Sequence, residues 1–200
     1  MKAISFVVFC AVLVVGCVQA NISDQSVCDG QSIMFVLPVL PPVPSGTMGQ
    51  VDMPQVSTTT SVDFSSALSN VSNIANNVHV SINSMTIDNP NGELSWVQTL
   101  EVDMTGSPAS QYPQTQLAIY NGGGGSELTP TLTASADTVL QYFESGQTTL
   151  TITLGSSAGT MVDAATVSML QGLPGYPNVS SAVNVCMSVQ GSVSKSVPGV

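Results

Sequence analysis

Positively charged side chains are almost absent from this chain, which has no arginine and only two lysines. Lys2 belongs to the N-terminal leader, so the remainder carries one lysine against twelve acidic residues, a formal charge of −11. Binding of nucleic acid and electrostatic docking on anionic lipid both depend on lysine and arginine. The composition therefore excludes nucleic acid as a predicted partner, and it excludes a membrane contact made through surface charge.

Histidine is also scarce, which leaves little for catalysis or metal binding. His79 is the only histidine, and its strand-like setting beside Ser81 and Asn83 predicts a solvated side chain that is not a general base. No Gly-x-Ser-x-Gly turn is present, and one histidine with one cysteine pair cannot supply a zinc site of recognised spacing. We predict no catalytic, cofactor-binding or metal-binding residue.

Two short segments share part of their composition with ligand-binding loops. Residues 88–93 concentrate acids, amides and a glycine, but they lack the length and alternating ligands of an EF-hand loop. Residues 122–125 are four glycines after a predicted strand, but no Gly-Lys-Ser/Thr sequence follows them. We interpret the first segment as an acidic turn and the second as a flexible hairpin.

A long uncharged apolar run occurs only near the N-terminus. Lys2 precedes this run and small residues follow it, which predicts a secretory signal peptide over residues 1–20. The run is shorter than the roughly 20 residues that cross a bilayer. Cleavage before Cys17, after the lipobox-like sequence Leu-Val-Val-Gly, would make Cys17 a lipid anchor, and we favour this site. Cleavage after Ala20 is the alternative and would release a soluble chain.

The cysteines outside the leader predict one disulfide. Cys10 lies in the apolar run and Cys17 at its end, which leaves Cys28 and Cys186. In an oxidising compartment such a pair is expected to be joined, here between the start of the exported chain and its last predicted strand.

The rest of the composition indicates a folded β protein with a polar but weakly charged surface. Only 7% of the residues are charged, whereas serine and threonine account for 46 of 200. Disorder requires low hydrophobicity, but 43% of this chain is hydrophobic and its mean hydropathy is +0.34. Such a composition is typical of exported β proteins.

Alternation of apolar and polar residues with a period of two predicts most of the secondary structure. Helical spacing occurs at residues 63–74 and after Ser135 or Asp137, where short helices are expected. This pattern predicts an all-β fold, mainly an antiparallel β-sandwich of the Ig-like kind, with one or two short helices in connections. The expected strands are 32–40, 55–62, 78–82, 94–104, 115–120, 131–134, 148–154, 164–170 and 183–193.

The chain without its leader has the length of one domain. Residues 21–54 are predicted to be a lead-in with one strand and a proline-rich segment, and its polar part runs from 21 to 31. Residues 55–197 are the predicted main β-sandwich domain, packed together with the strand at 32–40. Tyr112 and Tyr176 each precede a proline in a predicted loop, so they are the candidate exposed contact residues.

Residues 94–104 (LSWVQTLEVDM) and 139–143 (VLQYF), followed by the strand at 148–154, resemble uncharacterised bacterial lipoproteins with a predicted β-sandwich. The resemblance covers about residues 62–193. It implies a location in the cell envelope, and it transfers no activity and no functional residue.

Three functions of different classes follow from these observations. We favour a noncatalytic, exported sandwich tethered through Cys17 to the outer membrane or cell surface, with a structural, adhesive or protein-binding role and a protein or glycan partner. The alternative is a carrier for a hydrophobic ligand, suggested by the apolar residues at 34–40. A hydrolase that uses His79 ranks last. Free secretion is the alternative location.

Overall fold

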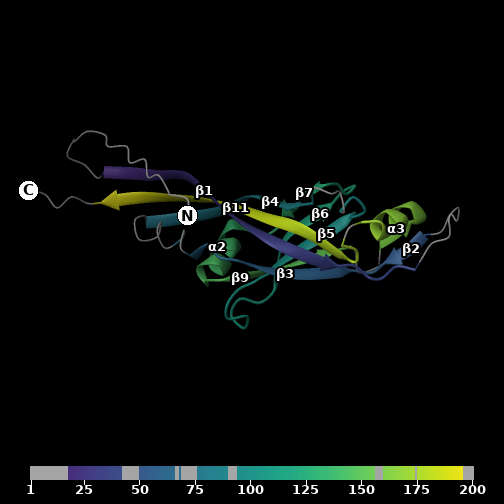
Figure 1. Cartoon of the computed structure of the whole chain (residues 1–200). Helices are drawn as coiled ribbons and strands as arrows, with labels where there is room; N and C mark the ends of the chain where they lie inside the picture. The colour runs from purple at the N-terminus through teal and green to yellow at the C-terminus, as the bar shows by residue number, and fades with distance from the viewer. Residues whose placement is uncertain are drawn as a thin grey trace, which may run out of the picture.

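The structure is a computed structural model that describes residues 18–41, 50–65, 68, 76–89, 94–155, 160–173 and 175–195. Two antiparallel sheets form most of the molecule, joined by a two-stranded sheet and by two helices among the described residues (Figure 1). Every strand pair in these ranges is antiparallel. The prediction of an all-β, mainly antiparallel sandwich with short helices in its connections is confirmed.

Sheet A has the strand order β1-β11-β4-β7, and sheet C has the order β3-β9-β5-β6-β8. The strands of sheet A are β1 (Val18–Val36), β11 (Asn178–Lys195), β4 (Asn76–Asp88) and β7 (Glu127–Leu128). The strands of sheet C are β3 (Val56–Val62), β9 (Thr148–Leu154), β5 (Thr99–Thr105), β6 (Thr115–Asn121) and β8 (Thr131–Leu132). The small sheet B pairs β10 (Thr160–Asp163) with β2 (Gln50–Met53).

Alternation along the strands places one apolar row of each sheet in a common core. In β5 and β9 every second residue is buried and the intervening ones are threonines or acids, as a sheet with one wet face requires. Burial of each large apolar side chain contributes roughly 1.5–3 kcal/mol. The largest fully buried side chains include Phe35, Phe64, Phe143, Leu37, Met85, Ile87, Leu117 and Leu150.

Three strands of sheet A extend together beyond the sandwich at one end, and α3 and β2 lie at the other end (Figure 1). We call this extension the arm: residues 18–27 of β1, 187–195 of β11 and 76–82 of β4, which the strand register brings side by side. The predicted polar lead-in at 21–31 is therefore wrong, because this segment is strand. Its few apolar residues concealed it, because a strand formed by backbone pairing with β11 needs no local sequence pattern.

The helix predicted after Ser135 is confirmed as α2 (Ala136–Glu144). The hydroxyl of Ser135 accepts the N–H of Thr138 at 3.2 Å, which caps the helix as expected. The helix packs against β4, and its Phe143 meets Phe64 edge to face with ring centroids 5.0 Å apart. The helix expected at 63–74 lies mostly outside the described residues, although Asp63 accepts the N–H of Ser65 at 2.8 Å in the manner of an N-cap.

The strand predicted at 164–170 is wrong, because this segment is the helix α3 (Ala164–Gln171). Asp163 provides the reason: its carboxylate accepts the N–H of Thr166 at 2.7 Å and starts the helix. Val167 and Leu170, three residues apart, are its buried face. The β-branched residues in this segment favoured a strand in the sequence, but the cap and the burial pattern prevail.

No helix in the described ranges is both long enough and apolar enough to span a membrane.

Candidate functional site

A shallow groove lies on the outer face of sheet A, the face turned away from the core. Odd-numbered residues of β1 and β11, such as Phe35 and Val183, are buried, so their even-numbered neighbours face solvent. The groove has a volume of about 570 Å³. It is lined by Ser32, Ile33, Met34, Asp88, Ser180, Ser181 and Ala182, which come from β1, β4 and β11.

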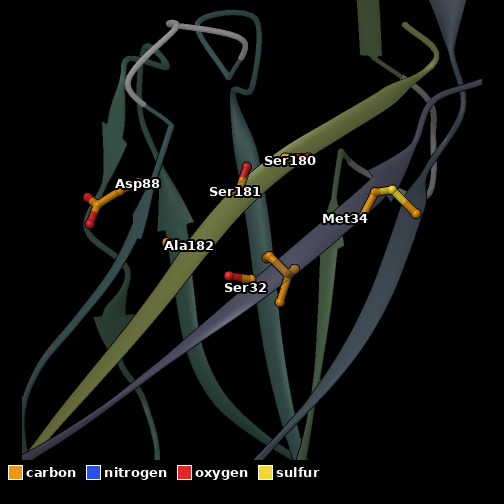
Figure 2. Close-up of a pocket in the computed structure, with 7 residues that line it drawn as sticks. Ser32, Met34, Asp88, Ser180, Ser181 and Ala182 are labelled. Carbon is orange, nitrogen blue, oxygen red and sulfur yellow. The ribbon is translucent and has the colours of Figure 1, made fainter. Parts of the chain in front are cut away.

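The strand register sets the order of these residues across the groove. Ser32 of β1 pairs with Ala182 of β11, which pairs in turn with Asp88 of β4. Neighbouring strands lie about 4.8 Å apart, so Ser32 and Asp88 are separated by roughly 10 Å with Ala182 between them. Figure 2 shows Asp88 on one side, Met34 on the other, and the small side chains between them. The floor is therefore open enough to admit a ligand.

The carboxylate of Asp88 is held in place by a neighbouring amide. Asn184 lies next along the outer face of β11, and its Nδ2 donates to Oδ2 of Asp88 at 2.8 Å. Gly30, the residue paired with Asn184 on β1, leaves room for this amide. A Cβ at Gly30 would lie 2.7 Å from Oδ1 of Asn184, so any larger residue would displace the amide. The three residues form a positioned acceptor at the groove.

Asn89 fixes the end of β4 beside the groove. Its side chain is fully buried, and its Nδ2 donates to the carbonyl of Ser180 at 2.6 Å and to the hydroxyl of Ser181 at 3.3 Å. Its backbone N–H donates to the carbonyl of Ser126 at 2.6 Å. In the described part of the segment interpreted as an acidic turn, Asn89 is thus a structural bridge, and Asp88 is its outward-facing neighbour.

The opposite side of the groove is apolar. Met34 is 51% exposed and Val36, two residues further along the same face, is 57% exposed. Exposed side chains of this size are uncommon on a sheet face that otherwise carries serine, alanine and asparagine. The groove therefore joins an acidic acceptor, hydroxyl groups and an apolar edge.

Charge around the groove is of one sign. The two lysines of the chain are Lys2 and Lys195, so no described side chain near the groove carries a positive charge. No cluster of three or more histidine, cysteine, aspartate or glutamate side chains in the described residues could hold a metal ion.

Two carboxylates away from the groove have a lowered pKa. Hydrogen bonds from Ser65 lower the pKa of Asp63, and those from Thr166 lower the pKa of Asp163; both act as helix caps.

The predicted disulfide between Cys28 and Cys186 is present. The two residues are directly paired across β1 and β11 on the outer face, on the arm side of Gly30 and Asn184. Cys17 lies outside the described residues, as does the side chain of His79. The groove thus shares its sheet face with the disulfide but with no other predicted site residue.

Tyr112 and Tyr176 are half-buried, so neither is as exposed as expected, and their role as contact residues stays a prediction. Tyr112 packs edge to face on Tyr142, with ring centroids 5.6 Å apart. The hydroxyl of Tyr176 donates to the carbonyl of Pro38 and accepts the N–H of Leu40, both at 2.8 Å. Each tyrosine contacts residues of the same chain that are distant in the sequence, and its position before a proline could not indicate those contacts.

Sequence reasoning did not find the groove, because its residues are brought together only by the pairing of distant strands. Asp88 and Asn184 are 96 positions apart, and nothing local links them. Met34 gave no signal of its own, because it lies within the apolar run at 33–37 and was interpreted as part of a buried strand.

Comparison with known proteins gives little for function: no protein-family model and no curated protein matches this chain. Among solved structures, a chain from Desmodium yellow mottle tymovirus is 9% identical with a TM-score of 0.30, covering 88% of this chain and 92% of the other. A turnip yellow mosaic virus chain is 12% identical with a TM-score of 0.27, covering 88% and 85%. A mud crab tombus-like virus chain is 11% identical with a TM-score of 0.28, covering 88% and 92%. At these scores the similarities carry no inference.

Proposed function

We propose that this chain is an exported, noncatalytic β-sandwich that is anchored at the bacterial cell envelope through a lipid on Cys17 and binds a partner there. The observation that carries the proposal is that residues 18–20 are strand and that each of them pairs with a residue of β11. Cleavage before Cys17 would keep these three pairs. Cleavage after Ala20 would remove three residues that pair with β11.

The arm is suited to hold the sandwich away from a membrane. Val18 pairs with Lys195, so the first and last residues of the long strands lie together at the tip of the arm. From residue 18 to Cys28 a strand extends roughly 33 Å, at about 3.3 Å per residue. An anchored Cys17 would therefore place the disulfide and the groove well clear of the lipid surface, where a partner can reach them.

The charge distribution supports this orientation. Lys195 is the only lysine outside the leader, and the register places it at the tip of the arm beside Val18. Of the twelve acids, only Asp24 lies within the arm. Anionic lipid would repel the acidic body, so the tip, which is far from most of the acids, is the end that can lie nearest to a membrane.

The disulfide supports export as well. Cys28 is exposed on the outer face of sheet A, and a disulfide at such a position persists only in an oxidising compartment. The carrier alternative has less support from the structure. Phe35, Leu37 and Leu40, which suggested it, are packed in the common core.

Expression of the full chain in a Gram-negative host tests the anchor. Cys17→Ser is the decisive variant, and Cys10→Ser is its matched control because Cys10 lies within the apolar run of the same leader. We expect the wild type and Cys10→Ser to be in the membrane fraction, resistant to a high-salt wash and labelled by radioactive palmitate, and Cys17→Ser to be unlabelled whether it is released or retained as precursor. Equal palmitate labelling of Cys17→Ser and wild type, or no labelling of either, would refute the lipid anchor.

A further inference from the structure

We propose that the groove on the outer face of sheet A binds a neutral sugar residue, with Asp88 as its principal hydrogen-bond acceptor. The inference specifies the ligand of the partner-binding role proposed above. It requires that the groove face the exterior of the cell, but it does not require a lipid on Cys17.

Charge restricts the ligand first. The groove contains a carboxylate, and the chain outside the leader has a formal charge of −11 with its single lysine at the tip of the arm. Phosphates, carboxylates and other anions would be repelled, since no cationic side chain is described there to pair with them. Asp88 is the only carboxylate that lines the groove, which is too few for a dedicated divalent-cation site.

The sheet itself restricts the ligand further. Under the groove β11 pairs with β1 throughout and with β4 as far as Ala182, and beyond that point the carbonyl of Ser180 accepts the amide of Asn89. An extended peptide binds a sheet through free backbone groups at an edge, and the edge of sheet A formed by β1 borders the groove and is not its floor. Recognition must come from side chains, and those present are the carboxylate of Asp88 and the hydroxyls of Ser32 and Ser180. Such groups select a ligand rich in hydroxyls.

Asp88 is prepared for this role. Its two oxygens can accept about four hydrogen bonds, and the amide of Asn184 uses one of them while fixing the orientation of the carboxylate. A ligand hydroxyl that donates to an ionised carboxylate makes a charge-assisted bond, roughly twice as strong as a neutral one. A preorganised acceptor also avoids part of the entropy cost of binding.

The apolar side of the groove completes the match. A sugar ring has hydroxyls around its edge and a C–H face that packs on apolar groups. Ala182 is on the floor between Ser32 and Asp88, and the half-exposed Met34 is at the side opposite Asp88 (Figure 2). A ring that donates to Asp88 would rest on the methyl group of Ala182, and Met34 would border the far side of the groove. Small side chains on the floor are what permit this approach.

Saturation-transfer NMR on the purified mature protein, with glucose, galactose, mannose and N-acetylglucosamine as separate probes, tests the inference. Glucuronic acid and choline serve as the anionic and cationic comparisons. We expect at least one neutral sugar to bind, and Asp88→Asn to weaken it about tenfold or more, as the loss of a charge-assisted hydrogen bond predicts.

Asp103→Asn is the matched control. Asp103 lies on the exposed face of sheet C and likewise accepts an amide, from Gln114 at 2.7 Å, so its substitution removes the same charge away from the groove. Its sugar affinity should equal that of the wild type. Gly30→Ala should also weaken binding, because it displaces Asn184 while the fold remains.

Failure of all four sugars to bind, binding of glucuronic acid or choline in their place, or an equal loss in Asp88→Asn and Asp103→Asn would each overturn the inference. Sugar binding by a protein that proves to have no lipid would refute the anchor and leave the groove assignment intact. A lipidated protein without sugar binding would do the reverse.

Discussion

Gly124 is the position at which a single added methyl group should do the most local damage. Its backbone has φ +69°, a conformation that other residues enter at a cost of roughly 1–2 kcal/mol. A Cβ there would lie 2.1 Å from the carbonyl oxygen of Ser95 and 3.0 Å from that of Leu94. Both contacts are with backbone atoms, so the clash cannot be relieved by rotating a side chain, and overpacking adds about 1–3 kcal/mol.

The expected cost of Gly124→Ala is therefore about 3 kcal/mol, which lowers the melting temperature of a domain of this size by roughly 6–12 °C. Gly123→Ala is the matched control, because no atom lies within 4 Å of a Cβ at Gly123. The control should be neutral or slightly stabilising, by about 0.4–1 kcal/mol, through a less flexible unfolded chain.

Thermal unfolding of the two variants by circular dichroism measures this difference. The segment also holds the carbonyl of Ser126 against the N–H of Asn89, so Gly124→Ala should weaken sugar binding as well. Equal melting temperatures for Gly123→Ala and Gly124→Ala would refute the reasoning, because they would show that the glycine run is the flexible hairpin expected from sequence and not a packed loop.

Three further predictions concern stability. The double variant Cys28→Ser/Cys186→Ser removes a disulfide whose cysteines are 158 residues apart, and it should lose at most about 5 kcal/mol of folding stability. The loss should be seen as a lower urea midpoint, and reductant should lower the midpoint of the wild type in the same way. Unchanged midpoints would contradict this. Tyr176→Phe removes a hydroxyl with two hydrogen bonds and should cost about 1–2 kcal/mol, whereas Tyr112→Phe, whose hydroxyl has no hydrogen bond to described residues, should cost less. Asp163→Ala should destabilise the protein at neutral pH. Because the helix cap lowers the folded-state pKa of Asp163, that stabilisation exists above the ordinary pKa of about 3.9 and is lost as pH falls through the folded pKa. The stabilities of the variant and the wild type should therefore converge in acid unfolding. A difference that stays constant with pH would contradict the cap.

The strands that sequence predicts well are those whose alternation reflects the core. β9 occupies Thr148–Leu154, the range expected from sequence, because threonines alternate there with Leu150, Ile152 and Leu154. The β1 segment of the arm was missed because pairing with β11 stabilises it, and a pairing partner more than 150 residues away leaves no local pattern. α3 was missed because its Asp163 cap lies within a segment rich in β-branched residues.

The candidate site illustrates the limit more sharply. The pairing of Cys28 with Cys186 was predictable because a cysteine forms a disulfide only with another cysteine, and these are the two outside the leader. No comparable sequence feature distinguishes Asp88, Asn184 and Gly30, since serine and asparagine recur at the solvent-facing positions of these strands. Only the register of β1, β11 and β4 shows that these three residues are neighbours.

Intact-mass spectrometry of the mature N-terminus tests the central claim most directly. The account predicts that a chain purified from the membrane fraction begins at Cys17 and carries acyl groups, so that all of β1 from Val18 onward is retained. A mature chain that begins at Asn21 with no added mass would contradict it. That result would make the protein a freely secreted sandwich whose arm has lost its first three paired residues.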